Sequence, residues 1–180
     1  SSLLTSIQEE TAQTLEKSRQ VARSVKASTS EVEEFSSSIQ ALSKSAEDTA
    51  RMARLIEDIL EITANKLDLI IFKHNAYFCI YNLVDTGFYT DHRSCNFGKW
   101  YYSSGMDKFG TYEEYREVEG HHERLHRYIE RALEVLKTEE PEKELIRRRE
   151  EILSDFEGVE EEASVIFKNF DLLIEKLEGR

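Results

Sequence analysis

A heptad pattern with no charged residue at its core positions runs through the first seventy residues of the chain. Counting in sevens from Leu4 gives one row of positions, and counting in sevens from Ile7 gives a second row. Both rows contain only apolar or small hydroxyl residues, although 33% of the chain is charged. Their members are Leu4, Ile7, Thr11, Thr14, Ser18, Val21, Val25, Ser28, Val32, Phe35, Ile39, Leu42, Ala46, Thr49, Ala53, Ile56, Leu60, Thr63, Leu67 and Ile70. This 3.5-residue period predicts a left-handed coiled coil roughly 100 Å long, at ~1.5 Å per residue.

The distribution of glycine and proline predicts an all-α fold with two parts. Neither residue occurs before Gly87, so the first part of the chain can form one uninterrupted helix. Five of the seven glycines lie between Gly87 and Gly120, which indicates turns between short elements. After Pro141, apolar residues recur at spacings of three and four and predict a closing helix. We therefore expect a coiled-coil rod over residues 1–60 and a helical bundle over residues 61–180.

Charge and hydropathy exclude several classes of function. The net charge of −12 repels polyanions, so we expect no nucleic-acid binding through a basic face. The longest apolar run, residues 76–81, has six residues, far short of the 18 or so that span a bilayer, so we expect no membrane insertion. Two cysteines are too few for a disulfide framework, which favours a reducing, cytoplasmic location.

All five histidines and both cysteines fall between His74 and His126. His122 and His126 are four residues apart, so a helix would place both imidazoles on one face. This spacing suits two ligands of one metal, but each residue could also be an ordinary core or surface histidine. Because Glu123 follows His122, the segment also matches the HExxH pattern of zinc proteases, in which the Glu activates a metal-bound water.

Two further residues could complete a metal site. Cys95 lies in a polar turn just before Gly98, a poor place for a buried apolar thiol, and His74 continues the helix that carries Leu67 and Ile70. With His122 and His126 they would form a closed His₃Cys shell of the donors that zinc prefers. A closed shell has no position for a substrate water, so it argues against an enzyme.

The remaining candidates are expected to lie outside this shell. Five residues along a helix from His74, Cys79 would face away and be a packed or free thiol. His121 points elsewhere than its neighbour His122. His92 could compete for the zinc or hydrogen-bond a ligand, but we favour surface exposure.

At these residues the sequence resembles a known family. The pattern His74-x-x-Tyr77, Cys95-Asn-Phe97-Gly98-Lys-Trp100 and His122-x-x-x-His126 is similar to the signature of the chemoreceptor zinc-binding (CZB) domain, over about residues 60–180. The segment between Tyr77 and Cys95 is short for this family. The resemblance implies a helical bundle in which His74, Cys95, His122 and His126 bind one Zn²⁺, with Tyr77, Phe97 and Trp100 packed around it.

The rod adds to the resemblance. Its helix, rich in Ser, Thr, Ala, Glu and Gln, is similar to the signalling rod of bacterial chemoreceptors, and residues 5–12 resemble their methylation pattern at Glu9 and Glu10. The resemblance implies the C-terminal part of a soluble chemoreceptor that signals to the chemotaxis kinase and adaptor. Because the uncharged heptad positions must be covered, we also expect a parallel homodimer through the coiled coil. For Glu9 and Glu10 we favour a simple exposed acidic pair.

Three functions remain open at this point. The leading hypothesis is a cytosolic sensory domain in which the thiolate of Cys95 responds to an oxidant such as hypochlorous acid, or the site responds to zinc itself. In the second, the zinc has only a structural role and stabilises a dimerisation domain at the end of the rod. The third, a zinc hydrolase of the HExxH type, is the least favoured.

Overall fold

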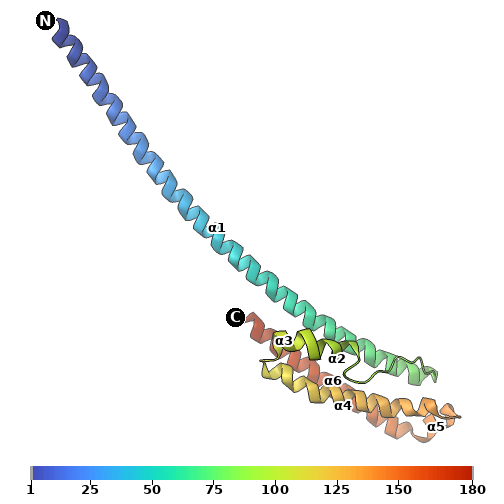
Figure 1. Ribbon diagram of the computed structural model, residues 1–180. Helices are drawn as coiled ribbons and strands as arrows, with labels where there is room; N and C mark the ends of the chain where they lie inside the picture. The colour runs from blue at the N-terminus through green and yellow to red at the C-terminus, as the bar shows by residue number, and fades with distance from the viewer. Residues whose placement is uncertain (1, 180) are drawn as a thin grey trace. The chain divides into compact units, whose positions relative to one another are not determined.

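The computed structural model describes residues 2–179, and within them the chain forms helices and no strands (Figure 1). The predicted all-α class is confirmed. None of the helices in this range has an apolar stretch long enough to cross a bilayer. In chain order the helical elements are α1 (Ser2–Asn82), α2 (Asn96–Trp100), the π-helical η1 (Tyr101–Gly105), α3 (Met106–Phe109), α4 (Glu113–Leu133), the 3₁₀ turn η2 (Glu134–Lys137), α5 (Pro141–Arg147) and α6 (Arg149–Glu178).

The chain divides into two units, residues 1–53 and residues 54–180. The predicted boundary between residues 60 and 61 stays a prediction, and this division falls near it. α1 contributes to both units as one continuous helix. Its continuity follows from the absence of glycine and proline.

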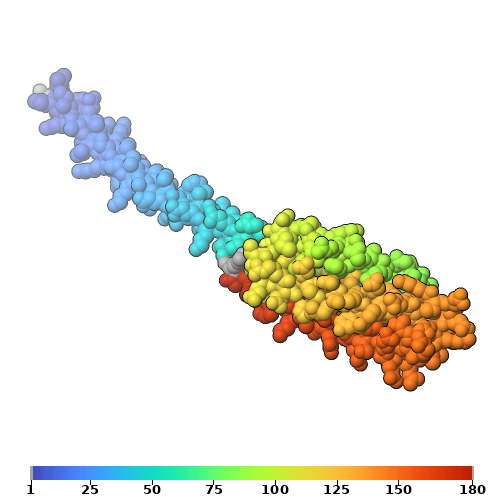
Figure 2. Space-filling view, turned by 60° about the horizontal axis from the view of Figure 1, so that its bottom comes forward, coloured from blue at the N-terminus to red at the C-terminus, as the bar shows by residue number. Residues whose placement is uncertain are grey.

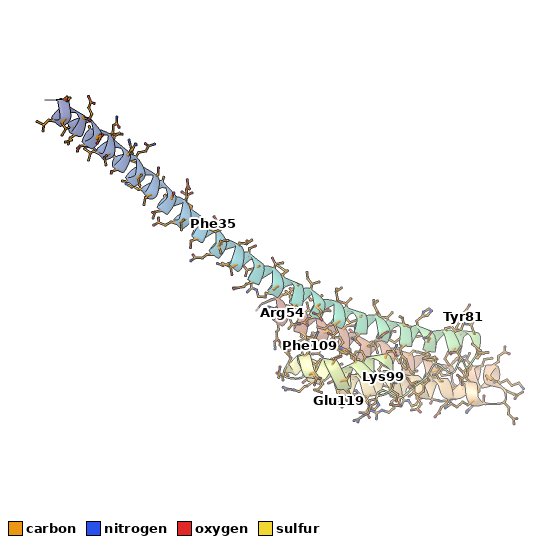
Figure 3. All side chains as sticks on the ribbon, turned by 45° about the horizontal axis from the view of Figure 1, so that its top comes forward. Phe35, Arg54, Tyr81, Lys99, Phe109 and Glu119 are labelled. Carbon is orange, nitrogen blue, oxygen red and sulfur yellow. The ribbon has the colours of Figure 1, made fainter. Side chains whose placement is uncertain are left out.

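In the first unit, every described residue of α1 is exposed in the single chain. The apolar heptad positions are exposed as well: Val32 has 65% of its surface accessible, and Phe35, labelled in Figure 3, has 67%. Hydroxyl residues fit this helix because they hydrogen-bond to their own backbone, as Thr11 Oγ1 does to the carbonyl of Ile7 at 2.6 Å. The first unit therefore carries an apolar stripe that the chain itself does not cover.

The second unit is a helical bundle in which α4 and α6 pack along each other and the last part of α1 completes the core (Figure 1). In Figure 2 the yellow, orange and red segments, which include α4 to α6, form one packed body. Each long helix contributes apolar side chains at helical spacing. The fully buried ones include Ile62, Leu69 and Ala76 of α1, Leu125 and Ile129 of α4, and Val159, Ile166 and Phe170 of α6.

In this second unit α1 has two different apolar faces. Ile62 and Leu69 are buried in the bundle, with 0% and 1% of their surface accessible. The heptad residues Leu67 and Ile70 are 54% and 45% exposed. The bundle thus covers a face of α1 that the heptad rows do not use, and the heptad stripe stays open beside it.

A change from Leu125 to Ala should destabilise the bundle. Leu125 is fully buried in the core, and truncating such a residue leaves a cavity, so we expect a loss of about 3 kcal/mol in the free energy of unfolding. Urea unfolding of zinc-free protein measures it. The matched control is Ile146→Ala, whose side chain is 63% exposed on α5, and it should change stability by less than ~0.5 kcal/mol. Equal losses in the two variants would contradict this account of the core.

Candidate metal centre

Three predicted ligands meet inside the second unit. The Sγ atom of Cys95 and ring nitrogens of His122 and His126 all lie within 4.8 Å of one another. The side chains are buried, with 8%, 1% and 2% of the residue surface accessible. Cys95 Sγ is 3.4 Å from His122 Nε2. Among the described residues this is the one group of three or more such donors that could hold a metal.

The local backbone explains where the thiol points. Cys95 is the N-cap of α2, with extended backbone angles, and its Sγ accepts a hydrogen bond from the Gly98 backbone N–H at 3.1 Å. The turn before it is fixed by Asp91, whose carboxylate accepts from the backbone N–H groups of Arg93 and Ser94 at 2.9 and 3.1 Å. This aspartate turn and the cap together hold the sulfur inward.

Gly98 is required by the same packing. A Cβ atom at this position would lie 1.9 Å from the carbonyl oxygen of His92, which belongs to the backbone and has no flexible side chain to yield. The start of α2 therefore packs directly against the turn that carries His92. This close approach is the physical reason for a glycine in the Cys-x-Phe-Gly-x-Trp segment.

The two histidines are on successive turns of α4, with ring centroids 4.7 Å apart. Beside these histidines, Glu162 of α6 bonds to two side chains of α4. Its carboxylate lies 2.7 Å from Arg124 Nε and 2.5 Å from His121 Nδ1. Burial alone would raise the pKa of Glu162, but the hydrogen bonds from Arg124 and His121 hold it below its usual value. These contacts of Glu162 hold the face of α4 that carries His121 and Arg124 against α6, and His122 on another face of α4 points into the core.

Burial keeps the cluster free of positive charge. It lowers the pKa of His122 to about 2 and that of His126 to about 4, with smaller contributions from neighbouring histidines. Burial also raises the pKa of the Cys95 thiol, although the Gly98 N–H opposes this. Neutral imidazoles are the form that binds metals, whereas the thiol must lose its proton when it becomes a ligand.

The residues fit zinc. Neither ring nitrogen of the buried His126 has a hydrogen-bond partner within the described part of the chain, an arrangement that costs free energy unless a ligand is bound. Two imidazoles and one thiolate are donors that zinc prefers. In a tetrahedral zinc site the sulfur and nitrogen ligand atoms are about 3.5 Å apart, close to the 3.4 Å between Cys95 and His122.

Aromatic rings enclose the cluster, but not all are those that the sequence indicated. Phe97 lies 4.4 Å from the His122 ring, as expected, and Trp100 packs behind Phe97 at 5.7 Å. Tyr77 lies elsewhere: it stacks on Phe156 at 4.4 Å, and its hydroxyl donates to Glu160.

Phe72 takes the place expected of Tyr77. It stacks on the His126 ring at 4.3 Å. The sequence contained the signal for it, since Phe72 is three residues after the core residue Leu69 on a helix.

The structure does not bring His74 into the cluster. Its side chain is exposed, and it lines a surface groove with Tyr81 and Leu153. The reason is helical phase: His74 is one heptad after Leu67, so it continues the exposed face of α1. The expectation that His74 lies near the core requires the face of Leu67 and Ile70 to be buried, whereas these two residues are 54% and 45% exposed. Three of the four expected ligands are therefore assembled.

The other candidates take varied positions. Cys79 is buried with its Sγ 3.4 Å from Thr86 Oγ1, away from the cluster, and His121 is bound to Glu162. His92 is only half-exposed, and its ring centroid lies 6.2 Å from that of His122. Glu123, the general base in the HExxH reading, is exposed.

A cavity of about 240 Å³ reaches the cluster from one side. Cys95 and His126 form part of its wall, with Phe72 and Asn75 of α1 and Lys99 of α2, which is labelled in Figure 3. Glu123 is not among the lining residues. A small solute can therefore approach the sulfur without crossing the bundle core.

Comparison with known proteins gives a family match. Residues 70–133 match the family model of the chemoreceptor zinc-binding domain, CZB. This segment includes all three clustered donors. No curated protein and no solved structure matches the chain.

A change from Gly98 to Ala should damage the metal centre. The added methyl group must displace the backbone at His92, which carries the turn before Cys95, so we expect zinc affinity to fall by at least about tenfold. Chelator competition measures this affinity. Gly120→Ala is the control, because its Cβ would meet only a flexible arginine end at 3.3 Å, and it should bind zinc normally. Unchanged zinc affinity in Gly98→Ala would show that the turn does not position the thiol.

Proposed function

We propose, from the premise that residues 70–133 are a chemoreceptor zinc-binding domain, that the chain is a cytoplasmic sensory module whose zinc–thiolate centre responds to its surroundings. The observation that carries the proposal is the buried cluster of Cys95, His122 and His126 beside a cavity. When bound, zinc supplies the positive charge that keeps the Cys95 thiol deprotonated. The ring nitrogens of the two neutral imidazoles lie within 4.8 Å of the Cys95 sulfur and of each other.

An oxidant is one stimulus that suits this centre. Cys95 is the redox-active member of the cluster, and the cavity gives a small electrophile access to it. The thiolate sulfur attacks the chlorine of hypochlorous acid and releases hydroxide, and water then displaces chloride to give the sulfenic acid. In sum, thiolate and hypochlorous acid become sulfenic acid and chloride, with sulfur oxidised by two electrons. The centre thereby loses its anionic donor.

Zinc itself is the other stimulus. Occupancy would follow the zinc concentration, since the cluster has one thiolate and neutral imidazoles. Oxidation of Cys95 and a fall in the zinc concentration both remove zinc from the centre, so both change the packing of the side chains around it. The two stimuli therefore have the same structural effect.

The output passes through α1. Phe72 of α1 stacks on the His126 ring, so a movement of His126 displaces Phe72 and with it this part of α1. The exposed heptad stripe of α1 includes Leu67 and Ile70 in the same unit. We propose that the rod carries the change to the rest of a chemoreceptor and, through it, to the chemotaxis kinase and adaptor.

A hydrolytic function is disfavoured. In an HExxH enzyme the glutamate faces the metal-bound water. Glu123 is exposed and lines no part of the cavity beside the cluster. We propose that the chain is not an enzyme.

The experiment combines zinc content with oxidation. Purified protein should contain one zinc per chain, and Cys95→Ala or His122→Ala should lose most of it, because each removes a buried donor. One equivalent of hypochlorous acid should release zinc from the wild type, measured with a chromophoric chelator, and mass spectrometry should find the oxidation at Cys95. Cys79→Ala, which removes the thiol outside the cluster, should behave like the wild type.

Two results would contradict the sensing proposal. Oxidation of Cys79 before Cys95 would move the redox chemistry away from the metal centre. Oxidation of Cys95 with zinc retained and α1 unchanged would leave only zinc sensing or a structural staple.

We also propose that the chain forms a parallel homodimer through its coiled coil. The heptad residues Leu4, Val25 and Leu42 are 69%, 60% and 66% exposed in the single chain. Such a long apolar stripe is unfavourable in water, and a second copy in register covers it.

A change from Ile39 or Leu42 to Lys should weaken this dimer, because it places a charge in the apolar seam. Sedimentation at micromolar concentration should show a shift toward monomer, while zinc content stays at the wild-type level. Gln40→Lys lies next to the seam and serves as the control. A wild-type chain that sediments as a monomer would contradict the proposal.

A further inference from the structure

The cluster of Cys95, His122 and His126 has one donor fewer than a closed zinc shell. Structural zinc sites almost always have four protein ligands in a tetrahedron. The expected fourth ligand, His74, faces away on the exposed stripe of α1. A closed structural site takes its fourth donor from the protein, so the candidate is a side chain that already lies next to the buried cluster.

His92 is such a side chain. Its ring centroid lies 6.2 Å from that of His122 and 6.4 Å from that of His126. Two imidazoles on one tetrahedral zinc have centroids about 5 Å apart, and His122 and His126 are already at 4.7 Å. The His92 ring is therefore little more than 1 Å farther from the other two rings than a zinc-bound imidazole would be. A rotation of its side chain covers that difference.

The backbone of His92 is fixed beside the thiol. Its carbonyl oxygen is 3.5 Å from Cys95 Sγ, and the start of α2 packs against it at Gly98. Cys95 N–H in turn donates to the carbonyl of Asp91 at 3.1 Å. One short turn therefore carries both residues, and only the imidazole of His92 has to move.

The nearby carboxylates are weaker candidates. Asp91 is exposed, and its carboxylate caps the turn through the N–H groups of Arg93 and Ser94. Asp68 is half-buried and lines the cavity, so it is the strongest competitor. An imidazole is preferred over a carboxylate in closed zinc sites that contain cysteine.

We propose that His92 is the fourth zinc ligand of this chain, in place of His74. The inference rests on the proposed zinc binding by Cys95, His122 and His126. The shell is then His₃Cys, as the donor types indicated, but two of its members come from the single turn of residues 91–95. Because His92 is half-exposed, it forms the solvent side of the centre.

The test compares His92→Ala with His74→Ala and Asp68→Asn in the full chain. Zinc affinity is measured by chelator competition, and circular dichroism of zinc-free protein checks that each variant is folded. His92→Ala should bind zinc at least about tenfold more weakly, and the visible bands of its cobalt form should change because water replaces an imidazole. The other two variants should remain within about twofold of the wild type, since their side chains are not ligands.

A gain-of-ligand variant gives an independent readout. His92→Cys places a second thiol at the metal, so its cobalt form should show a stronger sulfur-to-cobalt charge-transfer band than the wild type. His74→Cys should show no increase. This comparison works even if His92→Ala is less stable.

The outcomes separate the two proposals. Full affinity in His92→Ala with loss in His74→Ala would overturn the inference and leave zinc binding intact. Full affinity in both with a loss in Asp68→Asn would make Asp68 the ligand, and full affinity in all three variants would point to three protein ligands and a water. Either result overturns the inference. A wild type that binds no stoichiometric zinc would overturn the proposed function together with the inference.

Discussion

The close approach of one thiol and two neutral imidazoles inside the bundle is the constraint on which the rest of the structure depends. Cys95, His122 and His126 are buried, and the nitrogens of His126 have no hydrogen-bond partner within residues 2–179. Buried polar atoms without partners destabilise a fold unless a ligand satisfies them. The turn before α2 and the packing of α4 on α6 both serve to hold these three side chains together.

A single helix connects this centre to the exposed stripe. In the second unit, one face of α1 packs in the core through Ile62 and Leu69, and Phe72 stacks on His126. The heptad face with Leu67 and Ile70 is exposed in the single chain. We propose that a change at the metal centre reaches the dimerisation surface along this helix.

The sequence predicted those features that depend on local spacing. The all-α class, the long first helix and the pairing of His122 with His126 follow from periodicity. The N-cap position that turns the Cys95 thiol inward is a feature of the structure that the sequence did not indicate. The position of His74 depends instead on which face of α1 packs in the bundle. Two faces of this helix are apolar, one with Ile62 and Leu69 and one with Leu67 and Ile70, and the sequence does not show which of them is buried. The approach of His92 depends on the turn geometry around Asp91, which no periodic pattern encodes.

X-ray absorption at the zinc edge of the purified protein tests the central claim most directly. The account predicts one sulfur ligand at about 2.3 Å and imidazole nitrogens at about 2.0–2.1 Å, in a four-coordinate site with the multiple-scattering signature of histidine. Replacement of Cys95 by serine should remove the sulfur signal. A spectrum of the wild-type protein with only oxygen and nitrogen ligands, or with two sulfurs per zinc, would contradict a centre built on Cys95, His122 and His126.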